Sequence, residues 1–251
     1  MTTPVTPRPA ATCVLMRPHA GGGFEVFMVR RHIQSEFAPD VYVFPGGSVT
    51  DDDQQAERTP GLCAIVEGGD TLGNGFRVAA LRECFEEAGV LLARRGAEML
   101  AIGEDDVARI AGYRMALQQR QLTMSALARQ EGLSFATDAL TLWAHWITPE
   151  AMPKRFDTRF FLAEMPTSQE AAYDHLETTD GVWITPEEAS AGYERGDFPL
   201  VFAQIHQLSE LHGLGSFADA RARFAGQTPR TIMPRVVERD GKPVILLPDE
   251  E

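Results

Sequence analysis

The chain has 251 residues, of which 44% are hydrophobic, and its 36 acidic and 23 basic residues give a formal net charge of −13. A chain of this length can bury a sizeable core, and we expect a single domain over residues 1–251 that carries insertions. The acidic balance and the lack of a lysine or arginine stripe argue against a nucleic-acid binder and against a protein that attaches to anionic membranes.

The cysteines and the N-terminal residues bear on where the protein works. Cys13, Cys63 and Cys84 have no C-x-x-C spacing, and an odd number offers no disulfide framework, which favours a reducing compartment. The first residues contain no apolar signal segment, and no later apolar run approaches the ~20 residues of a membrane span. We therefore predict a cytoplasmic protein.

The predicted elements begin with two strands, residues 12–17 and 25–29, joined by a glycine-rich turn at residues 21–23. Residues 104–130 carry helix-forming residues at mixed helical spacing and predict one or two helices for core packing or partner contact. Residues 144–147 and 159–165 read as strands, and Thr185 with Pro186 predicts a helix start. Residues 202–251 predict a C-terminal extension with a helix and a final strand pair.

The most informative segment is a helix predicted over residues 81–88. It places Glu83, Glu86 and Glu87 on adjoining parts of one face, and Gly89 is suited to end it in the left-handed conformation. Like charges at this spacing repel, so a bound cation explains the cluster better than a bare surface does, with Mg²⁺ or Mn²⁺ as the natural hard ions. An isolated acidic pair would more often be a solvated helix face.

The same segment matches the second half of a known motif. In the Nudix box, G-x5-E-x7-R-E-U-x-E-E-x-G-U, U is a bulky apolar residue, and the match covers Arg82, Glu83, Glu86, Glu87, Gly89 and Val90. The chain therefore resembles the Nudix hydrolases, with Cys84 at a U position as a mild departure. The resemblance implies an α+β fold, an α/β/α sandwich with a mixed β-sheet between helices, here carrying helical insertions.

The first half of the motif is interrupted. Counting back from Arg82 places Asn74 where the motif has glutamate, whereas the Pro-Gly-Gly turn at residues 45–47 resembles the start of the box and is followed by Asp53 at the acidic position. About 21 extra residues then separate the two halves, and we expect an insertion over residues 48–75 in the form of a loop, including Gly68 and Gly69. Asp53 is either an outer metal ligand or part of a solvated turn.

An insertion inside the box is typical of the branch that contains the peroxisomal coenzyme A diphosphatase of mammals. Residues 27–31, 37–47, 143–149 and 155–162 also resemble that branch, so the similarity runs from about residue 10 to 200. The resemblance implies cleavage of the diphosphate in coenzyme A or acyl-coenzyme A. ADP-ribose, NADH or another nucleoside diphosphate derivative is an alternative substrate. A Nudix-derived nucleotide-binding module without catalysis is a third hypothesis, and a homodimer is possible.

Site residues follow from the same resemblance. Glu83, Glu86 and Glu87 are the expected metal ligands, one of which could instead polarise the attacking water, and Arg82 is expected to pair with a carboxylate and orient it. A backbone carbonyl at Gly47 would complete the metal shell. A further acid from a distant loop is expected among Glu164, Glu170, Asp174 and Glu177, and we favour Glu177.

Other residue types give weaker signals. Guanidinium groups match phosphate geometry, and the candidates beside the expected site strands are Arg30, Arg31, Arg155 and Arg159. The six histidines show no zinc spacing, and no G-x-S-x-G segment indicates a serine hydrolase. Trp143, Trp146 and Trp183 are expected to form core or pocket walls.

Overall fold

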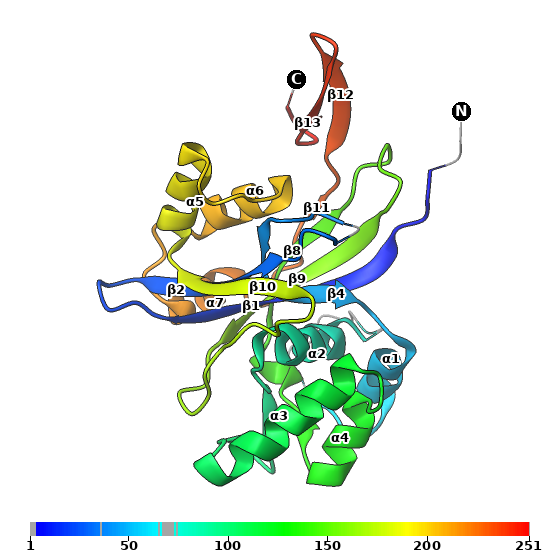
Figure 1. Cartoon of the computed structure of the whole chain (residues 1–251), viewed down its shortest axis with the longest axis vertical. Coiled ribbons are helices and arrows are strands. Elements are labelled where there is room, and N and C mark those ends of the chain that lie inside the picture. Colours follow the sequence, from blue (N-terminus) through cyan, green and yellow to red (C-terminus); the bar gives the residue numbers. More distant parts are fainter. Residues whose placement is uncertain (1–3, 36, 65, 67–72, 74, 251) are drawn as a thin grey trace.

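The computed structural model describes residues 4–35, 37–64, 66, 73 and 75–250. Within these residues, an eight-stranded sheet forms the centre, and helices cover both of its faces (Figure 1). Its strands run in the order β10-β2-β1-β9-β8-β11, with β3 on β2 and β4 on β1. Their bounds are β1 Arg8–Pro18, β2 Phe24–Arg31, β3 Tyr42–Val43, β4 Gly46–Ser48, β8 Thr141–Ile147, β9 Phe156–Glu164, β10 Thr178–Ile184 and β11 Thr231–Ile232.

The sheet is mixed, as predicted. Strands β1 and β9 are parallel neighbours at the centre, while β2 and β4 pair with β1 in the antiparallel direction. Alternate residues of β1 enter two different cores, because successive side chains of a strand point to opposite faces. Cys13 and Leu15 belong to one core, and Val14 and Met16 belong to the other.

The helices fall into two groups by the core to which they contribute. Helices α1 Asp51–Arg58, α2 Phe76–Ala88, α3 Glu104–Gln118 and α4 Met124–Glu131 pack into the core on one face. Helices α5 Pro186–Arg195, α6 Phe202–Leu211 and α7 Phe217–Phe224 pack into the core on the other face. Among the described residues, no helix is both long and apolar enough to span a membrane.

Two small sheets and one short helix lie outside the central sheet. Strands β5 Ala93–Arg95, β6 Glu98–Met99 and β7 Ser134–Phe135 form a three-stranded sheet, and the 3-10 helix η1 spans Thr137–Ala139. Strands β12 Arg235–Arg239 and β13 Lys242–Leu246 form a hairpin that projects from the body of the molecule beside the C-terminus (Figure 1). The predicted final strand pair is therefore present.

Several other predicted elements are present with longer bounds. The two N-terminal strands extend beyond residues 12–17 and 25–29, and residues 104–130 contain two helices, as the composition indicated. Thr185 caps α5 by accepting a hydrogen bond from the Glu188 amide, and Pro186 occupies the first turn. The predicted helix over residues 81–88 begins earlier, at Phe76, because Gly75 adopts a left-handed conformation (φ 80°) at its N-terminus.

The insertion expected as a loop over residues 48–75 contains a helix. Helix α1 lies within this insertion, and a capping box starts it: the Thr50 hydroxyl accepts from the Asp53 amide, and the Asp53 carboxylate accepts from the Thr50 amide. Three aspartates in the first turn also interact favourably with the positive end of the helix dipole. Gly68, Gly69 and Asn74 lie outside the described residues.

Candidate active site

The three predicted glutamates lie on α2, where that helix packs against the glycine turn at residues 45–47, whose two glycines begin β4. Glu83 and Glu87 are 9% and 3% exposed, and the Glu86 side chain is 20% exposed. The helix ends at Gly89, whose left-handed backbone (φ 75°) lets its amide donate to the Phe85 carbonyl. The spacing read from the sequence therefore produces one carboxylate-rich face, largely shielded from water.

The glycine turn approaches this face more closely than any other residue type would allow. The Gly46 amide donates to Glu87 Oε2 at 2.9 Å. A Cβ at Gly47 would lie 2.4 Å from Glu83 Oε1, so only a glycine fits against that carboxylate without displacement. Strand β4 is held in register by β1, where Gly47 pairs with Ala11.

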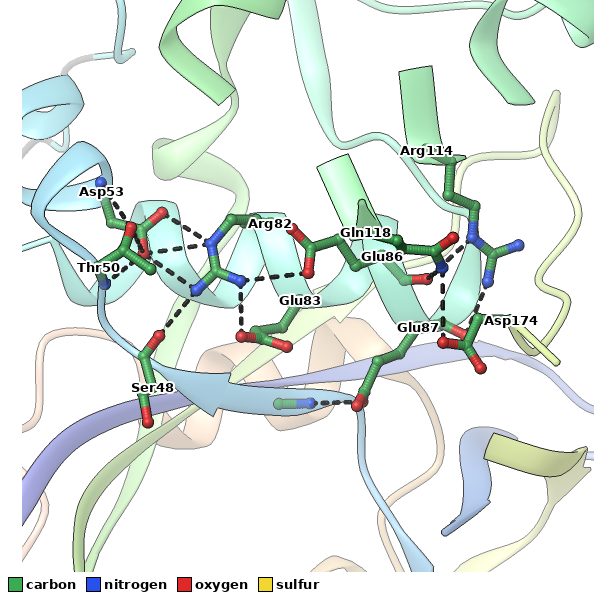
Figure 2. A network of polar contacts seen from close by, with 11 residues as sticks. Ser48, Thr50, Asp53, Arg82, Glu83, Glu86, Glu87, Arg114, Gln118 and Asp174 are labelled. Carbon is green, nitrogen blue, oxygen red and sulfur yellow. Dashed lines mark hydrogen bonds and ion pairs between the residues drawn. The ribbon is translucent and has the colours of Figure 1, made fainter. Parts of the chain in front are cut away.

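Arg82 connects the glutamates to the insertion, as Figure 2 shows. Its Nη1 donates to Glu83 Oε1 at 2.7 Å and to Glu86 Oε2 at 3.4 Å. Its Nε and Nη2 donate to the two Asp53 oxygens at 3.0 Å each, and Nη2 also donates to the Ser48 carbonyl at 2.8 Å. One guanidinium thus ties helix α1, strand β4 and helix α2 together.

Asp53 does not lie in the solvated turn that the sequence allowed. It is fully buried, which contradicts the solvated turn, and both of its oxygens accept from Arg82. Its Oδ2 also accepts from the backbone amide and the hydroxyl of Thr50. The carboxylate is thus occupied as the partner of Arg82 and Thr50.

Burial makes the ionised form of these glutamates costly. Burial raises the pKa of Glu83 to about 7, against the opposing attraction of Arg82. Burial, followed by the charge of Glu83, raises the pKa of Glu87 well above its ordinary range, and burial also raises the pKa of Glu86. Among the described residues, Glu87 makes no ion pair. When all three glutamates are ionised, this face of α2 therefore carries more negative charge than Arg82 alone balances.

The donor set fits a hard divalent ion. In the part of the chain that the structure describes, no group of three or more His, Cys, Asp or Glu side chains converges on one metal position. Instead, Arg82 holds Glu83 and Glu86, and Glu87 turns to the Gly46 amide. Mg²⁺ is usually bound by one or two carboxylates together with substrate phosphates, so a preassembled cage of three ligands is not required.

A cavity of about 1470 Å³ opens over this face. One part of its wall carries Glu83, Glu86, Glu87 and the Gly46-Gly47 turn. Another part is apolar and comes from segments far apart in the sequence, including Trp146, Met152, Phe156, Phe160 and Phe202. Such a cavity suits a ligand with an anionic end and a long apolar end.

The model of the NUDT19 Nudix domain matches residues 65–211, which is more than half of the chain. The chain belongs to this Nudix family. This match confirms the superfamily and the branch that the interrupted motif predicted.

Relatives and a solved structure agree with the match. The chain is similar to the acyl-coenzyme A diphosphatase NUDT19 of Xenopus laevis (25% identical, covering 75% of this chain and 60% of that protein) and of Gallus gallus (28% identical, covering 78% and 63%). It thus spans less than two thirds of their length. A crystal structure of a NUDIX hydrolase from Alicyclobacillus acidocaldarius is 29% identical, with a TM-score of 0.72 over 89% of this chain and 99% of that one, which confirms the Nudix fold.

Of the four arginines predicted for phosphate contact, the structure brings only Arg31 to the cavity of this Nudix protein. Arg30 instead pairs with Asp40, and Arg159 pairs with Asp157 and lies over the Phe76 ring.

The buried Arg155 is also engaged within the protein. Its guanidinium donates to the Thr148 and Val5 carbonyls and contacts Met233 Sδ. Arg30, Arg155 and Arg159 are therefore engaged by protein groups and do not line the cavity.

Of the four candidate distant acids, Glu177 is the one that lines the cavity. It is exposed, lines the cavity, and its charge raises the pKa of both Glu86 and Glu87. Asp174 has a different role, because its Oδ1 accepts from the amides of Leu176, Glu177 and Thr178 and so shapes the loop that carries Glu177. Glu164 and Glu170 do not line the cavity.

Sequence reasoning missed two polar residues of α3. Arg114 donates to the carbonyls of Glu86 and Glu87 at 2.9 Å each and to the Ala172 carbonyl at 2.8 Å. Gln118 Nε2 donates to the Glu86 carbonyl at 2.7 Å and lies 3.5 Å from Asp174 Oδ2 (Figure 2). These contacts satisfy carbonyls at the end of the Nudix helix, and nothing in the local sequence of α3 indicates them.

Proposed function

We propose that this chain is a metal-dependent Nudix pyrophosphohydrolase that cleaves the diphosphate of coenzyme A or acyl-coenzyme A. The observation that carries the proposal is the position of Glu83, Glu86 and Glu87, which line a large cavity beside a glycine turn. The substrate hypothesis is supported by the names of the frog and chicken relatives, which are acyl-coenzyme A diphosphatases.

The reaction adds one water across the diphosphate. The oxygen of the water forms a bond to one phosphorus atom, and the bond between that phosphorus and the bridging oxygen breaks. With coenzyme A, the products are 3′,5′-ADP and phosphopantetheine. The attacking water must lose a proton, so a carboxylate within reach has to accept it. We propose Glu177 for this role, because it lines the same cavity and its charge acts on Glu86 and Glu87.

Glu83, Glu86 and Glu87 are the residues that would hold Mg²⁺ or Mn²⁺, together with a backbone carbonyl at Gly47. When bound, the ion supplies positive charge to the diphosphate oxygens and lowers the pKa of a water. Arg82 positions two of the carboxylates through its 2.7 Å and 3.4 Å contacts to Glu83 and Glu86. Its remaining donors are held by Asp53 and Ser48, which fixes the guanidinium in place.

The apolar wall supports coenzyme A over smaller nucleotides. Trp146, Met152, Phe156 and Phe202 offer apolar surface to a pantetheine arm and to an acyl chain. Burial of such surface contributes roughly 25 cal/mol per Å². ADP-ribose and NADH have no comparable apolar arm and would leave this wall uncovered.

The test compares four substrates and two double variants. Coenzyme A, acetyl-coenzyme A, ADP-ribose and NADH are each incubated with Mg²⁺ or Mn²⁺, and phosphate-bearing products are separated and quantified. Wild type is run beside Glu86→Gln with Glu87→Gln. The matched control is Glu194→Gln with Glu238→Gln, which makes the same charge change at two exposed positions away from the cavity.

We expect metal-dependent cleavage of both coenzyme A compounds by wild type and by the control, and its loss in the site variant. Cleavage of ADP-ribose or NADH alone would keep the chemistry and overturn the substrate. Binding of these nucleotides without cleavage of any of them would overturn the enzyme proposal and favour a nucleotide-binding module.

A further inference from the structure

The inserted helices α3 and α4 reach the cavity through the segment that joins them. Leu117, Gln118, Arg120, Leu122 and Thr123 all line it, from the last turn of α3 to the N-cap of α4. The hydrogen bond from Gln118 to the Glu86 carbonyl fixes this segment beside the metal-binding face (Figure 2). The insertion is therefore part of the cavity wall.

Arg120 has a strained backbone in this segment. Its φ is 57°, in the left-handed region that a residue with a side chain rarely adopts. The chain uses glycine for a similar conformation at Gly132, which ends the next helix with φ 64°. An arginine at position 120 therefore carries a conformational cost, and such outliers concentrate at functional sites.

The Arg120 side chain is exposed at the cavity, and among the described residues it has no hydrogen-bond or ion-pair partner. The other arginines of the wall are engaged. Arg82 is held by three carboxylates, and Arg31 donates to the Phe37 carbonyl and lowers the pKa of Glu87 by its charge. A free guanidinium fork at the rim of a cavity is suited to a phosphate of the ligand.

This step rests on the proposed function, under which the metal-binding carboxylates hold the diphosphate. A phosphate that contacts Arg120 must therefore be a further group of the ligand, separate from the diphosphate. Coenzyme A carries such a group, a phosphate monoester on the ribose, whereas ADP-ribose and NADH do not. We propose that Arg120 is a specificity-determining residue that binds the 3′-phosphate of coenzyme A. The insertion thereby selects a nucleotide that carries an additional phosphate.

The first test measures kcat and KM for coenzyme A and for dephospho-coenzyme A, which lacks only the 3′-phosphate. Wild type, Arg120→Gln, Arg120→Lys and Arg129→Gln are compared. Arg129 is a matched control, because it is an exposed arginine of α4 that does not line the cavity. A hydrogen bond to a charged group corresponds to about 10- to 100-fold in affinity, so wild type is expected to prefer coenzyme A by about that factor.

Arg120→Gln is expected to lose the preference by raising KM for coenzyme A, with kcat and the values for dephospho-coenzyme A unchanged. Arg120→Lys keeps part of the preference, and Arg129→Gln keeps all of it. Equal use of the two substrates by wild type, or an equal loss on both substrates in Arg120→Gln, would overturn the role of Arg120 and leave the proposed function standing.

A binding experiment separates the two proposals. Calorimetry with adenosine 3′,5′-bisphosphate and with AMP needs no turnover. We expect wild type to bind the bisphosphate at least tenfold more tightly than AMP, and Arg120→Gln to bind the two nucleotides with equal affinity. This preference without hydrolysis of coenzyme A would support Arg120 and overturn the proposed function. Equal binding of both nucleotides to wild type would overturn the role of Arg120. Arg120→Gly, which relieves the backbone strain, is expected to raise the Tm and to lose the preference as Arg120→Gln does.

Discussion

Gly47 and Glu83 lie so close that a Cβ at position 47 would come within 2.4 Å of Glu83 Oε1. Gly47→Ala should therefore push the Glu83 carboxylate out of place. We expect the fold to remain, because the displaced atoms are the end of a side chain, and the affinity for Mg²⁺ to fall at least about tenfold. Calorimetric titration with Mg²⁺ measures this change.

The control for that substitution is Gly112→Ala in helix α3, where an added Cβ meets no atom within 4 Å. Alanine is favoured over glycine in a helix by about 1 kcal/mol, so this variant should be slightly more stable and bind Mg²⁺ normally. An unchanged Mg²⁺ affinity in Gly47→Ala would contradict the assignment of Glu83 as a ligand.

The local part of the site could be predicted from the sequence. The segment from Arg82 to Glu87 needs only helical spacing to form one carboxylate-rich face, and the helix does form. The Thr50 and Asp53 spacing of the capping box is also present in the sequence, but the run of three aspartates equally fits a solvated turn or an outer ligand. The pairing of Asp53 with Arg82 joins positions 29 residues apart and depends on how α1 packs.

The position of Arg159 depends on which face of strand β9 its side chain occupies. Phe156, Thr158 and Phe160 of β9 line the cavity, so Arg159 points to the opposite face and lies over Phe76 of α2. The position of an arginine on a strand of the site does not by itself specify on which face of the sheet its side chain lies. The contacts of Arg114 and of Gln118 to α2 depend on tertiary packing of an inserted helix, which local sequence does not encode.

The buried pair of Asp53 and Arg82 should be essential for stability. Asp53→Asn leaves Arg82 with Glu83, Glu86 and the Ser48 carbonyl as partners and removes the charge of a fully buried carboxylate. Breaking a buried ion pair costs about 3 kcal/mol or more, and we expect a loss of that size in chemical denaturation. Asp51→Asn, at an exposed position of the same helix, should change stability little. Equal denaturation midpoints for Asp53→Asn and Asp51→Asn would show that the ion pair of Asp53 and Arg82 contributes nothing to stability.

Glu87→Gln should affect stability and function in opposite directions. Burial and the charge of Glu83 disfavour the ionised Glu87, and an amide removes that cost while its oxygen still accepts from the Gly46 amide. Without metal, we expect the variant to be as stable as wild type or about 1 kcal/mol more stable. The increase in Tm that Mg²⁺ gives wild type should be absent. Lower metal-free stability together with a normal Mg²⁺ response would contradict this.

Metal binding should depend on pH through Glu83. Its pKa is raised to about 7 in the folded protein, so its contribution to metal-free stability is full below about 4.5 and is lost as pH rises through 7. Protons compete with Mg²⁺ for this carboxylate, so the apparent affinity at pH 6 should be about tenfold lower than at pH 8. Thermal shifts over a Mg²⁺ series at both pH values test this, and equal affinities would show that Glu83 is not titrating in this range.

Arg114 should link the inserted helix α3 to the activity of the Nudix helix. Its guanidinium satisfies the carbonyls of Glu86, Glu87 and Ala172, and the Ala172 contact anchors the segment that leads to Glu177. Arg114→Leu leaves three carbonyls without this donor, which should cost about 2 kcal/mol and lower kcat more than it raises KM. Arg114→Lys should lose less of both than Arg114→Leu does. The control Arg109→Gln, a surface change on the same helix, should leave kcat and Tm close to the wild-type values. A stability loss in Arg114→Leu with unchanged kcat would limit Arg114 to packing, because a positioning residue must alter the rate of the reaction itself.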